Sequence, residues 1–223
     1  MIQSIYYKEW HKSRWTLLII LLAFTGVILY SFINISQNLR VQGINNVWDL
    51  IVQKGIYYFT PIKYLPLLAG VLLAISQYTP EMINKRLKLT LHLPLHESKI
   101  MMSMLFYGIL NLILLFTMVY TAIFWGTRLY FPSEVAFWNT EVILPWLLGG
   151  IAAYLLTSWI CIEPVWKQRI MNSIITILIL ALFYFDAIPG AYSPSLIYLT
   201  IITILSISFS FFSLIRFKDG ELF

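Results

Sequence analysis

The chain has 223 residues, of which 60% are hydrophobic and only 11% are charged, and its mean hydropathy is +0.80. Because ordinary soluble domains carry roughly 25% charged residues, this much apolar surface excludes a water-soluble fold and requires lipid as the solvent. The net charge of +5 predicts no nucleic-acid partner, since basic residues at the inner surface of a membrane account for it. The single cysteine, Cys161, excludes an internal disulfide and a multi-cysteine zinc site.

Continuous apolar runs of about 20 residues predict an all-α polytopic membrane protein, because a membrane barrel would instead show alternating segments of about 10 residues. The chain forms a single transmembrane domain over residues 1–223 with six spans. The first run is too long for the core of a signal peptide and no cleavage pattern follows it, so we expect an uncleaved span. The six predicted spans are residues 15–35, 64–78, 100–126, 142–162, 170–185 and 194–215.

Residues 1–14 precede the first span and form an amphipathic pattern at helical spacing. Ile2, Ile5, Tyr6 and Trp10 share one face, and Lys8 lies opposite. Aromatic residues on such a face sit at the depth of the lipid headgroups. We therefore predict a short elbow helix that lies in the inner membrane interface, with a frayed basic tail as the alternative.

The segment between the first and second spans, residues 36–63, is the longest outer segment. Apolar residues recur at helical spacing from Ile44 to Val52, which predicts an amphipathic or re-entrant helical piece on the outer face. Aromatic residues at 57–59 and around the second outer loop are typical of an interfacial belt, although a carbohydrate- or lipid-binding cluster would use the same residues. In the second span, Pro66 and Gly70 hint at a broken helix.

The stretch of residues 84–104 runs from the segment after the second span into the start of the third. It is basic, and leucine occurs at every second position from 87 to 95. On a helix Leu87, Leu91 and Leu95 share one sector and Leu89 and Leu93 lie opposite, so the helix would have two apolar sides. Such a helix needs two neighbours. One would be the membrane or the chain's own helices, and the other would be a second protein.

Prolines mark the expected limits of this helix. We predict that Pro80 starts it, that Glu81 lies in its first turn, that Pro94 ends it and that Ser98 caps the third span. His92 and His96 are four residues apart, but Pro94 between them would break the helix that a metal site needs, so no metal site is expected. The fourth span carries small residues at the spacing that lets helices approach closely, either within the chain or between two protomers. They are Gly149, Gly150 and Ala153.

Basic residues place both ends of the chain on the cytoplasmic side, because Lys and Arg near span ends mark that side. With the N-terminus inside, only Arg40, Lys54, Lys63 and Arg128 lie outside. The eleven basic residues that fall inside are Lys8, Lys12, Arg14, Lys85, Arg86, Lys88, Lys99, Lys167, Arg169, Arg216 and Lys218.

The sequence lacks both the intramembrane ionisable residues of an ion-coupled transporter and the nucleotide-binding motif of an ATPase. No ionisable residue lies well inside a predicted span, where ion-coupled pumps usually place one. No G-x-x-x-x-G-K-[ST] motif occurs, so the chain has no nucleotide-binding P-loop of its own. If the protein moves a substrate uphill, the energy must enter through another polypeptide.

The stretch KRLKLTLHLPLHESKIMMSM resembles the first cytoplasmic loop of ABC-2 family permeases, the membrane halves of ABC exporters. In that family a short coupling helix is followed by a leucine-proline turn, a small or polar residue, a basic residue and the third span. Leu93-Pro94 and Lys99 match this order, with residues 96–98 intervening. The layout is also similar, with an elbow helix, six spans and both ends inside.

The resemblance implies a non-catalytic permease subunit in the bacterial plasma (inner) membrane, one half of a dimeric transporter with an identical or homologous second permease. A separate cytoplasmic ABC ATPase would bind ATP and Mg²⁺, and this chain would hold no cofactor. The substrate path would run between the second and fifth spans of opposing protomers. The expected ATPase-docking residues are Glu81, Lys85, Arg86, Leu87, Lys88 and Leu91. A stand-alone secondary transporter or channel, and a membrane scaffold that transports nothing, are the alternatives.

Overall fold

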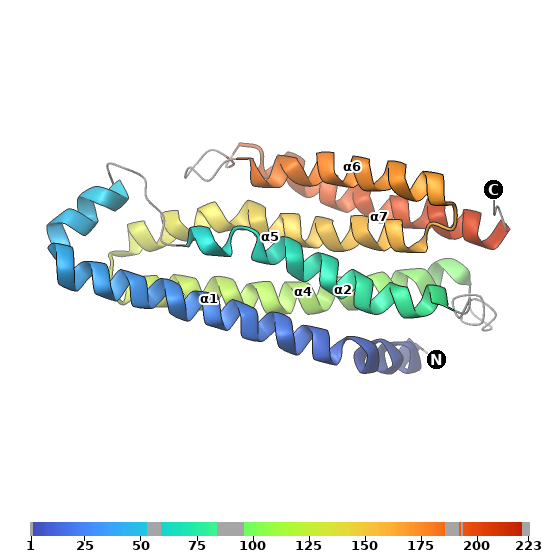
Figure 1. Ribbon diagram of the computed structural model, residues 1–223, viewed down its shortest axis with the longest axis horizontal. Coiled ribbons are helices and arrows are strands. Elements are labelled where there is room, and N and C mark those ends of the chain that lie inside the picture. Colours follow the sequence, from blue (N-terminus) through green and yellow to red (C-terminus); the bar gives the residue numbers. More distant parts are fainter. Residues whose placement is uncertain (1, 53–58, 84–95, 186–191, 193, 220–223) are drawn as a thin grey trace.

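The computed structural model describes residues 2–52, 59–83, 96–185, 192 and 194–219, and in these ranges all regular structure is helical (Figure 1). Six of the described helices are long and apolar enough to cross a membrane, which confirms the prediction of an all-α polytopic membrane protein with six transmembrane helices. The elements are α1 (Ile2–Val52), the short 3-10 helix η1 (Thr60–Ile62), α2 (Leu65–Met82), α4 (Glu97–Arg128), α5 (Ser133–Ile162), α6 (Trp166–Tyr184) and α7 (Leu196–Asp219).

The long helices run side by side, and α5 lies at the centre of the bundle (Figure 1). It contacts α2, α4, α6 and α7, and it is the most buried of the six candidate spans. Its burial follows from its composition, because it is apolar around its whole circumference and carries small residues where neighbours come close. The N- and C-terminal ends of the chain lie at the same end of the bundle.

Glycines allow α2 and α5 to cross in direct backbone contact. A Cβ atom on Gly70 would lie 2.1 Å from the carbonyl oxygen of Gly150 and 3.2 Å from the Cβ of Ala153. A Cβ on Gly150 would lie 2.6 Å from the carbonyl oxygen of Pro66. Gly149 instead faces α6, where a Cβ would lie 2.9 Å from the Cβ of Phe183. The small residues of the fourth span therefore make their close contacts within the chain.

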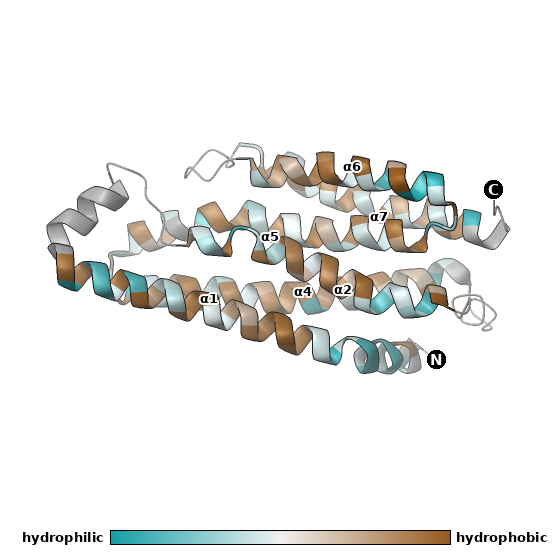
Figure 2. Cartoon of the chain, in the orientation of Figure 1, coloured by the Kyte–Doolittle hydropathy of each residue, from teal (hydrophilic) through white to brown (hydrophobic). Residues whose placement is uncertain are grey.

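The outside of the bundle is apolar along most of its length (Figure 2). Large hydrophobic side chains such as Leu22, Ile177 and Ile204 are more than half exposed. In water these surfaces would drive aggregation, whereas in a bilayer they contact acyl chains. The polar colouring is concentrated toward the ends of the helices, as a membrane-spanning bundle requires.

Three segments that the sequence predicted as separate pieces form one continuous helix. The expected elbow helix over residues 1–14, the span over 15–35 and the outer helical piece up to Val52 all belong to one helix, α1. No proline occurs before Pro61, so no residue interrupts the backbone hydrogen bonds over this length. Figure 1 shows that α1 bends near both of its ends, so its first turns still run at an angle to the long apolar stretch.

Two further predictions about helix ends were wrong. Pro80 lies inside α2 instead of starting a new helix, and Glu81 lies in the last turn of α2. The helix α4 begins at Glu97 with His96 at its N-cap and no capping side-chain hydrogen bond, so Ser98 is not the cap. A break does lie near Pro66, because the 3-10 helix η1 ends at Ile62 and α2 begins only at Leu65, whereas α2 continues without a break through Gly70. Pro66 lies in the first turn of α2, where its missing N–H costs no helical hydrogen bond.

Candidate functional site

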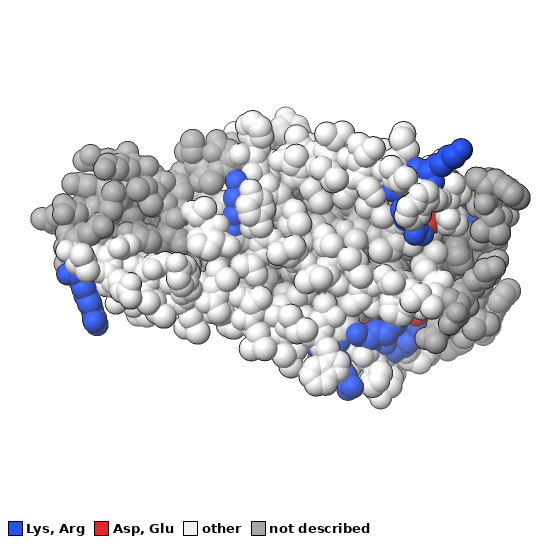
Figure 3. Space-filling model, in the orientation of Figure 1, with Lys and Arg blue, Asp and Glu red and all other residues white. Residues whose placement is uncertain are grey.

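The charged side chains of the described residues gather at the end of the bundle that holds both termini (Figure 3). This end also holds the last turn of α2, the first turn of α4 and the short connection from α5 to α6. At the opposite end the described basic residues are Arg40, Lys63 and Arg128. At the charged end, the basic residues whose side chains the structure describes are Lys8, Lys12, Arg14, Lys99, Lys167, Arg169 and Arg216.

Four of these charged side chains form a cluster between α1 and α2, here called the Glu81 cluster (Lys8, Glu9, Lys12 and Glu81). Both lysine Nζ atoms contact Oε1 of Glu81, Lys8 at 2.9 Å and Lys12 at 2.8 Å. Lys12 Nζ also lies 2.7 Å from Oε1 of Glu9. Glu9 is 0% exposed and Glu81 is 3% exposed, so both carboxylates are withdrawn from solvent. The two lysines balance their charge.

The spacing along α1 explains how these groups meet. Ile5, Glu9 and Ser13 recur every four residues, which places them on one face of the helix, and all three are buried. Lys8 and Lys12 have the same spacing on the neighbouring strip and reach α2. Ser13 extends the contact to α4, because its hydroxyl lies 2.8 Å from the hydroxyl of Tyr107.

One turn before Glu81, Gln77 ties α2 to α4 and α5. Its Nε2 donates to the carbonyl oxygen of Met104 over 2.8 Å, and its Oε1 accepts from the hydroxyl of Tyr154 over 2.8 Å. Tyr78 lies beside them, with its hydroxyl 3.5 Å from that of Tyr154. Gln77, Tyr78 and Tyr154 are all 0% exposed. A buried amide with both of its polar atoms paired fixes the relative positions of the helices that it joins.

A second cluster lies at the same end between α5, α6 and α7, here called the Glu163 cluster (Glu163, Gln168, Arg169, Ser213 and Arg216). The Oε2 atom of the fully buried Glu163 accepts a hydrogen bond from Ser213 and lies 3.5 Å from Nη1 of Arg216. Arg169 donates to the backbone carbonyl of Glu163 over 2.7 Å, and Arg216 donates to Gln168 over 2.7 Å. These bonds hold the ends of α6 and α7 to the end of α5.

The structure describes only part of the site that the sequence predicted. Glu81 is one of the expected docking residues, and its carboxylate is already bound by two lysines of the same chain. Its part in docking stays a prediction. The other expected docking residues lie outside the described residues, and they are Lys85, Arg86, Leu87, Lys88 and Leu91.

Sequence reasoning missed the partners of Glu81 and the whole Glu163 cluster. Glu9 and Lys12 were visible as a pair three residues apart, which is the spacing of an ion pair on one helix face. Only 10 residues of the chain are acidic, so an acidic residue beside an apolar span was itself a signal that a basic partner would be near. Which basic residue would pair with which acid depends on helix packing, which the sequence does not show.

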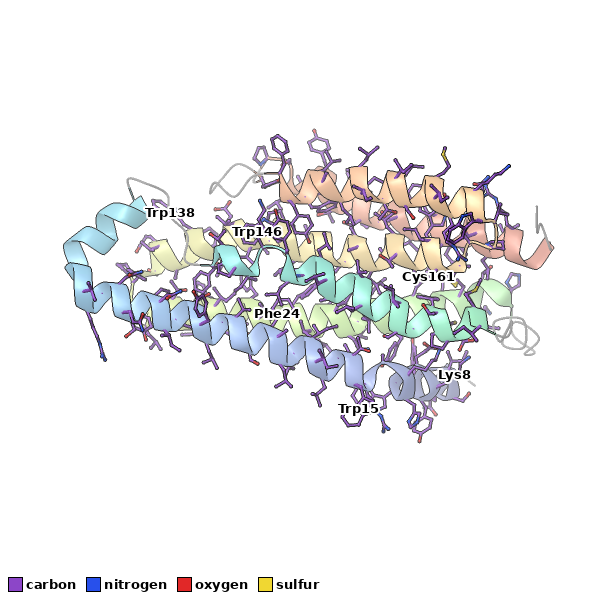
Figure 4. The ribbon with its side chains drawn as sticks, in the orientation of Figure 1. Lys8, Trp15, Phe24, Trp138, Trp146 and Cys161 are labelled. Carbon is purple, nitrogen blue, oxygen red and sulfur yellow. The ribbon has the colours of Figure 1, made fainter. Side chains whose placement is uncertain are left out.

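The described residues hold no group of three or more His, Cys, Asp or Glu side chains that could bind a metal. Cys161 lies one residue before the end of α5 and is partly buried (Figure 4). No family model, curated protein or solved structure matches the chain. The geometry of the two clusters links the ends of helices that are far apart in the sequence.

Proposed function

We propose that the chain is the permease subunit of an ATP-binding-cassette transporter. It forms half of a substrate pathway together with an identical or homologous second permease, and it couples to a separate cytoplasmic ATPase that binds ATP and Mg²⁺. The chain itself carries out no catalysis. It lies in a bacterial plasma membrane with both termini in the cytoplasm.

The observation that carries this proposal is the attachment of the last turns of α2 to three other helices. Glu81 is paired with Lys8 and Lys12 of α1, and Gln77 is bonded to α4 and α5. The basic, leucine-rich segment 84–95 follows directly in the chain. A displacement of that segment by a bound protein would pull on α2, and the buried bonds would carry the displacement into the bundle.

Charge and composition support the cytoplasmic side for this segment. The end of the bundle beside it holds most of the described basic residues (Figure 3), as the cytoplasmic end of a membrane protein does. The lack of a P-loop motif in the sequence requires a partner if the transport is driven by ATP. The leucine spacing and basic residues of segment 84–95 in the sequence match the pattern of an amphipathic helix that enters a groove of a partner.

The test replaces the expected anchors of segment 84–95. The double variant Leu87→Asp with Leu91→Asp should release the P-loop ATPase that copurifies with the wild-type chain from its native membranes, because buried apolar anchors carry most of the affinity of such contacts. Lys88→Ala is the matched control and should retain the ATPase, since a charge at the rim affects mainly the association rate.

Membrane insertion and gel-filtration profile of the double variant must match those of the wild type, which shows that the permease still folds. An ATPase yield equal to that of the wild type in this folded variant would overturn the docking assignment. Absence of any P-loop ATPase from the wild-type preparation would overturn the proposed function itself.

A further inference from the structure

A groove of about 650 Å³ runs along the outside of the bundle between α1 and α4. On α1 its wall includes Leu18 and Leu21, and on α4 it includes Leu114 and Met118. Leu18, Leu114 and Met118 are about half exposed or more. This stretch of the groove is therefore an open apolar channel whose surface matches a hydrocarbon chain.

One end of the groove is polar and aromatic. Trp10, Arg14 and Trp15 line it from α1 and Asn111 lines it from α4. The guanidinium carbon of Arg14 lies 5.6 Å from the centre of the Trp15 ring, which orients the cation. Within the described part of the chain no carboxylate pairs with Arg14, whereas Lys12, close by on the same helix, is paired with two glutamates. Arg14 is thus a fixed cation at the mouth of an apolar channel.

The groove is long enough for a headgroup and the upper part of an acyl chain. From Trp10 to Leu21 it follows eleven residues of α1, which at about 1.5 Å each span at most roughly 16 Å. Trp10 to Trp15 lie at the polar end, so the apolar part of the groove holds the part of an acyl chain next to the headgroup. Trp10 and Trp15 are both at least half exposed, and Trp15 lies on the outer side of α1 (Figure 4). Exposed tryptophans of this kind sit at the headgroup level of a membrane.

We propose that this groove is a binding site for one anionic glycerophospholipid of the leaflet next to the N-terminal end of the bundle. The phosphate of the headgroup binds the Arg14 guanidinium, and one acyl chain lies against Leu18, Leu21, Leu114 and Met118. An Arg–phosphate contact gives charge-assisted hydrogen bonds, which a neutral amide cannot replace. The inference does not depend on the proposed transport function.

The test is native mass spectrometry of the full chain, purified in mild detergent and mixed with phosphatidylglycerol or phosphatidylcholine of identical acyl chains. The wild type should retain one phosphatidylglycerol per chain and bind it roughly tenfold more tightly than phosphatidylcholine. Both lipids offer a phosphate to Arg14, but the choline cation of phosphatidylcholine offsets the phosphate charge and is repelled by the guanidinium, whereas phosphatidylglycerol keeps a net negative charge. Arg14→Gln should remove this preference. Leu114→Trp, which fills the channel, should lower the retention of both lipids.

Two control variants match these changes elsewhere on the surface. Arg128→Gln removes an exposed arginine that also lies over a tryptophan, with its Cζ 5.5 Å from the ring centre of Trp125. Leu178→Trp enlarges an exposed residue of α6 outside the groove. Both should bind lipid as the wild type does.

Equal affinity of the wild type for the two lipids would overturn the assignment of Arg14 to a headgroup. An equal loss in Arg14→Gln and Arg128→Gln would show a general surface-charge effect and would overturn the site. A dimer of the chain that forms without bound lipid and is broken by Leu114→Trp would show that a second copy occupies the groove, which also contradicts the proposal.

Discussion

Lys12 is the residue on which the Glu81 cluster depends. It contacts Glu9 and Glu81, which are both buried, and its own side chain is only 16% exposed. Lys8 contacts Glu81 as well, but its side chain is 39% exposed and is screened by solvent. The two lysines therefore allow a matched comparison at one site.

We expect Lys12→Met to lower the free energy of unfolding by about 3–5 kcal/mol, because it removes the cation that contacts the buried Glu9 and leaves Glu81 to the more exposed Lys8. Lys8→Met should cost no more than about 1 kcal/mol, as for an exposed ion pair. Denaturant titration of both purified variants in the same detergent measures the difference. Equal losses in the two variants would show that Lys12 has no special place in the cluster.

Gly70 gives a second comparison at the residue scale, at the crossing of α2 and α5. A Cβ there would meet the Gly150 carbonyl oxygen at 2.1 Å, so Gly70→Ala must push the helices apart. Overpacking of this kind costs about 1–3 kcal/mol. Gly26 of α1 has nothing within 4 Å of its Cβ position, so Gly26→Ala should be neutral or should stabilise by up to about 1 kcal/mol. Thermal unfolding in detergent reports both, and a stable Gly70→Ala variant would contradict the close crossing.

At the scale of the element, α2 connects segment 84–95 to the packed helices of the bundle. It lies against α5 along its length, it carries Gln77 and Glu81 near one end, and segment 84–95 follows it. Pro80 lies within its last turn, where the missing N–H weakens the backbone hydrogen bonding. The ion pairs of Glu81 with Lys8 and Lys12 therefore stabilise the end of α2, where Pro80 removes one backbone hydrogen bond.

The six spans could be predicted from the sequence because long apolar runs have only one stable form in lipid, the helix. Helix ends were predicted less well, since the backbone continues past the apolar run wherever side chains find partners. Residues 133–141 were expected in an outer loop, yet Val135, Ala136 and Thr140 are buried in the first turns of α5. The Glu81 and Glu163 clusters join residues from distant parts of the chain, so no local pattern could reveal their pairing.

The direction of α4 in the membrane can be tested by cysteine labelling in a Cys161→Ser background. Ser98 and Leu129 are exposed at opposite ends of α4. We expect a membrane-impermeant thiol reagent added to intact cells to label Leu129→Cys but not Ser98→Cys, because the basic end of the bundle should face the cytoplasm. Both positions should react after the membrane is opened. Labelling of both variants in intact cells would contradict a membrane-spanning α4.

At the scale of the whole molecule, the bundle has two parts that meet at α5. The helices α1, α2 and α4 pack on one another, and α2 and α4 also pack on α5, whereas α6 and α7 pack chiefly on α5. Each part has its own ion-paired cluster at the same end, around Glu81 and around Glu163. A partner that binds at this end could move the two parts relative to each other, which is what a permease needs in order to open and close a path.

The most direct test of this account is the mass and composition of the complex that the full-length chain forms in its native membranes. The tagged chain would be extracted in mild detergent without crosslinking and analysed by native mass spectrometry. We expect two permease subunits, including the 26.0 kDa chain, together with a P-loop ATPase that leaves the complex when Leu87 and Leu91 are both changed to Asp. A chain that is recovered alone, or only with partners that bind no ATP, would contradict the assignment as an ATP-driven permease.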